Sequence, residues 1–139
     1  MRKMLVVITV IIVVLLLSSF WKDIYYYSID NMKWKRLSSN IKDENVSKII
    51  LDSKNTIGLV GAEKSDFIKN LSEAKFYRSN WRKIGPTGAI ITMIFKDGSE
   101  QNFEYWGSAT FETTFENGQF LIKSNEIERV LKKYNITLD

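Results

Sequence analysis

The stretch that decides the fold is AIITMIFKDGSEQNFEYWG, residues 89–107. Its first seven residues form a nearly continuous apolar run rich in β-branched side chains, which is typical of a central strand. Asp97-Gly98 follows and is a strong signal for the tight turn of a hairpin. Phe103 and Tyr105 then alternate with polar residues, as in a strand with one buried face. The stretch therefore predicts two antiparallel strands joined by a tight turn.

The residues that follow repeat this pattern. Phe111, Thr113 and Phe115 alternate with Thr110, Glu112 and Thr114, which predicts another half-buried strand. Asn117-Gly118 predicts a type I′ turn with positive φ at both central positions, and residues 119–123 return as the next strand. The sequence predicts positive φ less strongly for Gly107. Four strands after residue 88 are thus predicted to form an antiparallel meander.

Two helices and two earlier strands complete the predicted domain. Residues 46–52 and 55–61 have the composition of strands, and residues 75–88 are expected to be an irregular link. The helix over about 63–75 has one apolar face: Phe67, Ile68, Leu71 and Ala74. A closing helix is capped by Ser124 or Asn125 and also has one apolar face: Ile127, Val130, Leu131 and Tyr134. The order β-β-α-β-β-β-β-α predicts an α+β fold in which two helices cover the meander.

The chain begins with MRKMLVVITVIIVVLLLSSFWKD. A helix over residues 4–21 would be roughly 27 Å long, close to the hydrocarbon core of a bilayer. Phe20 and Trp21 suit the membrane interface, where aromatic rings are favoured. A cleaved signal peptide shares the basic start and the apolar middle, but it needs small residues at its cleavage site, and LLLSSFWKD fits that pattern poorly. We therefore expect residues 1–21 to stay as a transmembrane anchor in contact with the lipid bilayer.

Basic residues lie on both sides of this anchor. Arg2 and Lys3 favour a cytoplasmic N-terminus, whereas Lys33, Lys35 and Arg36 argue for the reverse orientation. We expect a cell-membrane protein with a cytoplasmic N-terminus and its C-terminal domain outside. The absence of cysteine agrees with an oxidising location.

The remaining chain divides into two parts. Residues 22–44 have mixed charge and little periodicity, and we expect a juxtamembrane stalk that is partly helical around residues 24–34. Residues 45–139 are expected to form one extracytoplasmic α+β domain, because that length suits a single core. After residue 21 the chain has 18 basic and 16 acidic residues, a weak net charge that does not favour nucleic-acid binding.

The composition also excludes several kinds of chemistry. The chain has neither cysteine nor histidine, so it has no disulfide, no thiolate nucleophile and none of the usual zinc sites. Ser-His-Asp catalysis is excluded for the same reason. Any catalysis would depend on carboxylates, lysine, tyrosine or serine. We predict no catalytic residue, no metal site and no cofactor.

One segment combines basic and aromatic residues without acids. The predicted partner-binding residues are Lys75, Arg78, Trp81, Arg82 and Lys83. Such a cluster could contact an anionic polymer, lipid headgroups or an acidic partner. The alternative is a solvated helix end and loop whose aromatic rings are half buried.

Residues 97–122 have the opposite bias, with five acids and no lysine or arginine. Glu100, Asn102 and Glu104 share one face of a strand at a period of two. Paired carboxylates can hydrolyse glycosides or hold a hard cation. Exposed acids on a meander also keep a domain soluble and protect its edges, and this second interpretation is the one we favour.

The segment KFYRSNWRKIGPTGAIITMIFKDGSEQNFEYWG, residues 75–107, also carries a family resemblance. It resembles the extracytoplasmic domains of small membrane-anchored proteins of Bacillus-type Gram-positive bacteria. That group has no established activity, so the resemblance implies an envelope-associated domain and assigns no residue a role.

These observations favour a non-catalytic binding or interaction module that recognises an unknown protein or envelope component. One alternative is an envelope hydrolase that uses Glu100, Glu104 or Glu112. The other is a cytoplasm-facing module that acts at the membrane surface.

Overall fold

The computed structural model describes residues 2–80 and 88–136, and within them the chain forms a seven-stranded sheet and three helices. Every strand pair is antiparallel, which confirms the predicted α+β class. The elements in chain order are α1 (Arg2–Asn40), β1 (Val46–Asp52), β2 (Thr56–Leu59), α2 (Gly61–Ser72), β3 (Lys75–Ser79), β4 (Ile90–Phe95), β5 (Glu100–Gly107), β6 (Thr110–Phe115), β7 (Gly118–Lys123) and α3 (Asn125–Lys133).

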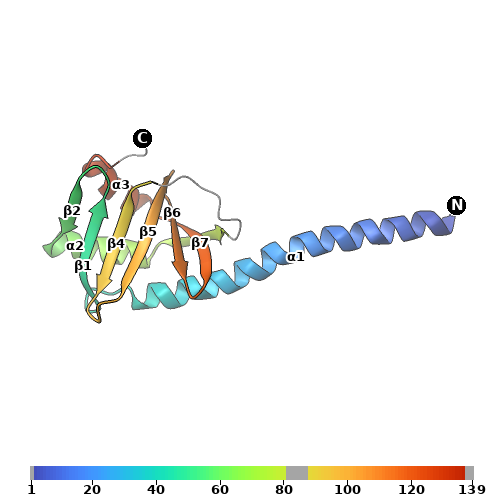
Figure 1. Cartoon of the computed structure of the whole chain (residues 1–139), viewed down its shortest axis with the longest axis horizontal. Helices are drawn as coiled ribbons and strands as arrows, with labels where there is room; N and C mark the ends of the chain where they lie inside the picture. Colours follow the sequence, from blue (N-terminus) through green and yellow to red (C-terminus); the bar gives the residue numbers. More distant parts are fainter. Residues whose placement is uncertain (1, 81–87, 137–139) are drawn as a thin grey trace.

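The strands lie in the order β2-β1-β4-β5-β6-β7-β3, so the predicted meander β4–β7 is confirmed. The helices α2 and α3 lie together on one face of the sheet, and the C-terminal part of α1 passes the β6–β7 side (Figure 1). The core fills the space between these helices and the sheet. The helix order and the turn at Asp97-Gly98 are also confirmed, with Gly98 at φ +86°.

The strand β3 lies in a segment predicted to be an irregular link. Its sequence KFYRS has no clear alternation of apolar and polar residues, and its register shifts between Phe76 and Arg78. The segment becomes a strand because it pairs with β7 and packs the ring of Phe76 against Phe120 at 5.8 Å between centroids. Such long-range pairing leaves no local pattern for sequence analysis to detect.

The helix α1 differs most from expectation, because it runs without a break from the apolar N-terminal stretch into the core of the domain. Residues 22–44 were expected to be a stalk outside the domain. Instead Trp34, Leu37 and Ile41 are 4%, 2% and 1% exposed and belong to the main hydrophobic cluster. Their spacing of three and four residues places them on one helical face. A domain that began at residue 45 would lack this face.

Trp34 packs α1 against the sheet. Its indole Nε1 donates a hydrogen bond to the carbonyl oxygen of Ala74 at 2.9 Å. Its ring meets Phe103 and Phe120 edge-on, with centroids 6.5 and 6.2 Å away. Truncation of a buried tryptophan costs about 3–5 kcal/mol, a large fraction of the stability of a small domain. The C-terminal part of α1 is therefore part of the folded unit.

The helix α1 also crosses the β6–β7 hairpin, close to Gly118 at the start of β7. The residues with positive φ are Glu116 and Asn117, at 48° and 60°, and Phe115 pairs with Gly118. The two-residue turn therefore lies one position earlier than the Asn117-Gly118 prediction, which was wrong. It is Gly107 that has positive φ, at +84°.

Gly118 instead lies where two side chains of α1 approach the hairpin closely. A Cβ atom at this position would lie 2.6 Å from Oδ1 of Asp30 and 2.8 Å from the Lys33 side chain. Asp30 is itself buried and pairs with the Lys33 ammonium at 3.5 Å. The side chain of Arg36 pairs with Glu116 in the turn, which joins α1 to the hairpin a second time.

A buried polar cluster joins α3 to the β5–β6 turn. Ser124 caps α3 as predicted and accepts a hydrogen bond from the Ile127 amide at 3.2 Å. One turn later, the Glu128 carboxylate accepts hydrogen bonds from the Tyr105 hydroxyl and from the Ala109 amide. Burial, followed by the bond to Glu128, raises the pKa of Tyr105 to about 12. The bond from Tyr105 in turn lowers the pKa of Glu128.

We expect Gly118→Ala to destabilise the chain by about 1–3 kcal/mol, because the added methyl group would push aside the buried Asp30 carboxylate and the Lys33 side chain of α1 and disturb their ion pair. Gly58→Ala is the matched control. Its Cβ would meet only Lys48 Cε, at 3.8 Å, so its stability should change by less than about 1 kcal/mol. Urea denaturation of the detergent-solubilised chain measures both. Equal losses for the two variants would contradict the close packing of α1.

We expect Tyr105→Phe to destabilise the chain at neutral pH, since it removes a hydrogen bond to a carboxylate that contributes about 1.5–3 kcal/mol. The raised pKa of Tyr105 means that its contribution is fully present below pH 10 and is lost as the pH rises toward 12. The difference in unfolding free energy between the two chains should therefore shrink over this range. A difference that stays constant from pH 7 to pH 12 would show that Tyr105 is not the titrating group.

Candidate functional site

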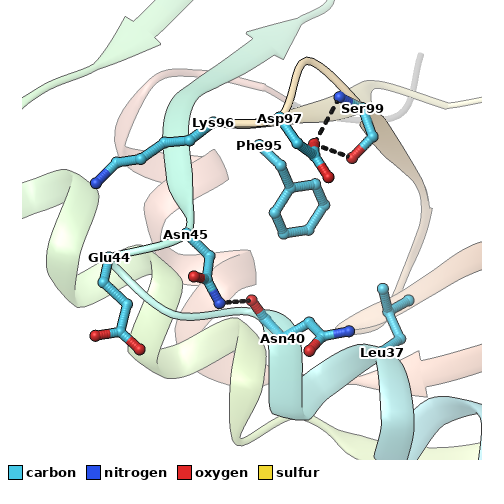
Figure 2. Close-up of a pocket in the computed structure, with 8 residues that line it drawn as sticks. All are labelled: Leu37, Asn40, Glu44, Asn45, Phe95, Lys96, Asp97 and Ser99. Atoms are coloured by element: carbon cyan, nitrogen blue, oxygen red, sulfur yellow. Dashed lines mark hydrogen bonds between the residues drawn. The ribbon is translucent and has the colours of Figure 1, made fainter.

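A pocket of about 480 Å³ lies between the C-terminal end of α1 and the β4–β5 turn, and we call it the distal pocket (Figure 2). Its lining residues are Leu37, Asn40, Glu44, Asn45, Phe95, Lys96, Asp97 and Ser99. They come from two segments 50 positions apart in the chain, residues 37–45 between the end of α1 and the start of β1, and residues 95–99 around the β4–β5 turn. Sequence analysis missed the pocket for this reason. Of the features that form it, the sequence predicted only the Asp97-Gly98 turn.

The walls of the distal pocket combine apolar and polar groups. In Figure 2 the side chains of Leu37 and Phe95 extend into the space between α1 and the turn, whereas Glu44 and Lys96 point outward. The Asn45 amide donates to the Asn40 carbonyl oxygen at 3.1 Å, which holds the end of α1 next to the start of β1. The pocket therefore has an apolar wall and an amide rim.

Asp97 contributes a negative charge to the wall formed by the β4–β5 turn. Its Oδ1 accepts hydrogen bonds from the hydroxyl and the amide of Ser99, at 2.6 and 2.9 Å. These bonds, the hydroxyl first, lower the pKa of Asp97, so the carboxylate is ionised at neutral pH. Its second oxygen can accept a hydrogen bond from a ligand. A site of this size and chemistry suits non-covalent recognition of a small polar group.

The structure brings together part of the predicted basic cluster. Lys75 and Arg78 are exposed on β3, at the edge of the sheet. Tyr77 lies between them and is 46% exposed, with Lys123 Nζ 4.0 Å from its ring centroid. The remaining predicted residues, Trp81, Arg82 and Lys83, lie outside the described part of the chain.

The acidic residues lie on the sheet face opposite the helices. Glu104 and Glu112 are direct neighbours across β5 and β6, and Glu100 lies farther along β5. Glu112 accepts hydrogen bonds from the side-chain amides of Asn80 and Gln119. The shallow space over these acids has a volume of about 270 Å³, and none of the three is buried. Among the described residues, no group of three or more acids is placed to hold a metal ion.

Phe20 and Trp21 lie on the part of α1 that contacts no other element, and they are 64% and 70% exposed. This part of α1 is long and apolar enough to cross a membrane, judged by length and composition. The apolar residues from Met4 to Leu17 are 46–71% exposed, so no other element of the described fold covers them.

Comparisons with known proteins provide no function to transfer, since no family model, no curated protein and no solved structure matches this chain.

Proposed function

We propose that the chain is a single-pass protein of the cell membrane, with a cytoplasmic N-terminus, whose domain is a non-catalytic interaction module outside the cytoplasm. The observation that carries the proposal is the continuity of α1 (Figure 1). One helix contains an apolar segment with no partner in the described chain and a second segment with Trp34, Leu37 and Ile41 buried in the core. A bilayer would cover the first segment, as the hydrophobic effect requires.

Because α1 is continuous, the domain would be held at a fixed distance from the membrane surface. Trp21 and Asp30, the first buried residue of α1, are nine positions apart, which corresponds to about 13 Å of helix. Asn40, at the distal pocket, lies up to about 28 Å from Trp21 along the same axis. A helix without breaks transmits position, since it has no flexible joint. The distal pocket would therefore face away from the membrane, where a partner or an envelope component can reach it.

The charges and pocket chemistry support recognition over catalysis. The distal pocket offers an apolar wall, an amide rim and the ionised Asp97 carboxylate, with Glu44 and Lys96 at its edge. The hydrolase alternative would use Glu100, Glu104 or Glu112, which lie on an open face, and Glu112 is already engaged by two amides. Glycoside hydrolysis requires a substrate cleft between the carboxyl groups. The cytoplasm-facing alternative differs only in orientation.

We expect a photoreactive residue in place of Lys96 to form discrete adducts in native membranes, because this side chain points outward at the rim of the distal pocket. The same residue in place of Lys48, on β1, is the matched control and should form far fewer adducts. Mass spectrometry of the adducts identifies the protein or polymer that is attached.

The same cells test the orientation. Protease added after removal of any cell wall should destroy a C-terminal tag on intact cells. A tag that is cut only after lysis would contradict the proposed orientation and favour the cytoplasm-facing module. Equal adduct yields from positions 96 and 48 would contradict recognition at the distal pocket.

A further inference from the structure

We propose that the edge of the sheet formed by Lys75, Tyr77 and Arg78 of β3 and Lys123 of β7 docks on anionic lipid headgroups of the bilayer that holds α1. We call these four residues the β3 edge. The inference rests on the proposed membrane anchoring, and it adds a second contact between the domain and the membrane. It holds for either orientation of the chain.

The first argument is the direction of β3 relative to α1. Trp34 of α1 bonds to the carbonyl of Ala74, immediately before β3. Two residues farther along, Phe76 packs edge-on against Tyr27, with ring centroids 5.1 Å apart. As β3 advances, its contacts on α1 move from residue 34 back to residue 27. The strand therefore runs toward the N-terminal, apolar part of α1. In Figure 1, β3 is the unlabelled yellow-green arrow that points in this direction.

The second argument is the distance between β3 and the membrane, measured along α1. Tyr27 is six residues from Trp21, which is about 9 Å along a helix. The headgroup layer extends roughly 5–8 Å beyond the hydrocarbon core. Phe76 thus lies close to the outer limit of this layer, and Tyr77 and Arg78 continue in the same direction. Long basic side chains reach farther still, because their charged ends extend away from the backbone.

The third argument is charge. Lys75, Arg78 and Lys123 are all exposed, and within the described ranges none of them makes an ion pair. Lys75 lies directly opposite Lys123 in the sheet, an arrangement that costs stability through repulsion. The guanidinium of Arg78 lies 5.8 Å from the Tyr77 ring centroid. Two cations over the Tyr77 ring, Arg78 and Lys123, together with the exposed Lys75 complement a surface of phosphate groups.

The test uses the whole chain in nanodiscs of either pure phosphatidylcholine or a mixture with phosphatidylglycerol. The chain has no cysteine, so Tyr77→Cys provides one labelling site for a nitroxide. Docking should lower the collision rate of this label with a water-soluble nickel complex in the anionic nanodiscs, and salt should restore it. Each basic residue near an anionic surface changes the ratio of docked to undocked domain about five-fold.

Lys75→Gln combined with Arg78→Gln should therefore remove the response to phosphatidylglycerol. Lys48→Gln combined with Lys69→Gln makes the same charge change elsewhere and should leave the response intact. Equal label accessibility in both lipids, or a response that survives in the first double variant, would overturn the inference and leave an acidic protein as the partner chemistry. Extraction of the native chain by alkaline carbonate would instead contradict the membrane anchoring itself.

Discussion

The packing of Trp34, Leu37 and Ile41 under the sheet is the interaction on which the rest of the structure depends. It places the last third of α1 inside the domain, and the remainder of the same helix carries the apolar segment outward. Where α1 crosses the β6–β7 hairpin, the Asp30 and Lys33 side chains approach Gly118 closely, and the ion pair between Arg36 and Glu116 joins the helix to that hairpin. One helix thus determines both the core and the position of the domain.

In the proposed membrane protein, the two ends of the domain would therefore make different contacts. The distal pocket lies at the C-terminal end of α1, far from the apolar segment, whereas β3 runs back toward that segment. Recognition at one end and lipid contact at the other would hold the domain in one orientation.

Sequence analysis predicted the elements that have local signals. The meander from residue 89 to residue 123 followed from alternation and turns, and the cap at Ser124 followed from residue type. The role of α1 in the core was missed, because Trp34 and Leu37 lie among charged residues and are buried only by long-range packing. The turn at Glu116 and Asn117 was displaced by one residue, since a glycine at a close approach of two elements resembles a glycine required for positive φ. The distal pocket joins segments that only the fold brings together.

The most direct test of the shared helix is a distance distribution between two nitroxide labels on the full chain in nanodiscs, one in place of Ser18 and one in place of Lys48. These positions lie on the apolar part of α1 and on β1. A continuous α1 that is packed into the core predicts one narrow distribution, and two glycines inserted between Trp21 and Asp30 should broaden it. A broad distribution in the native chain would show a flexible connection and would contradict the account.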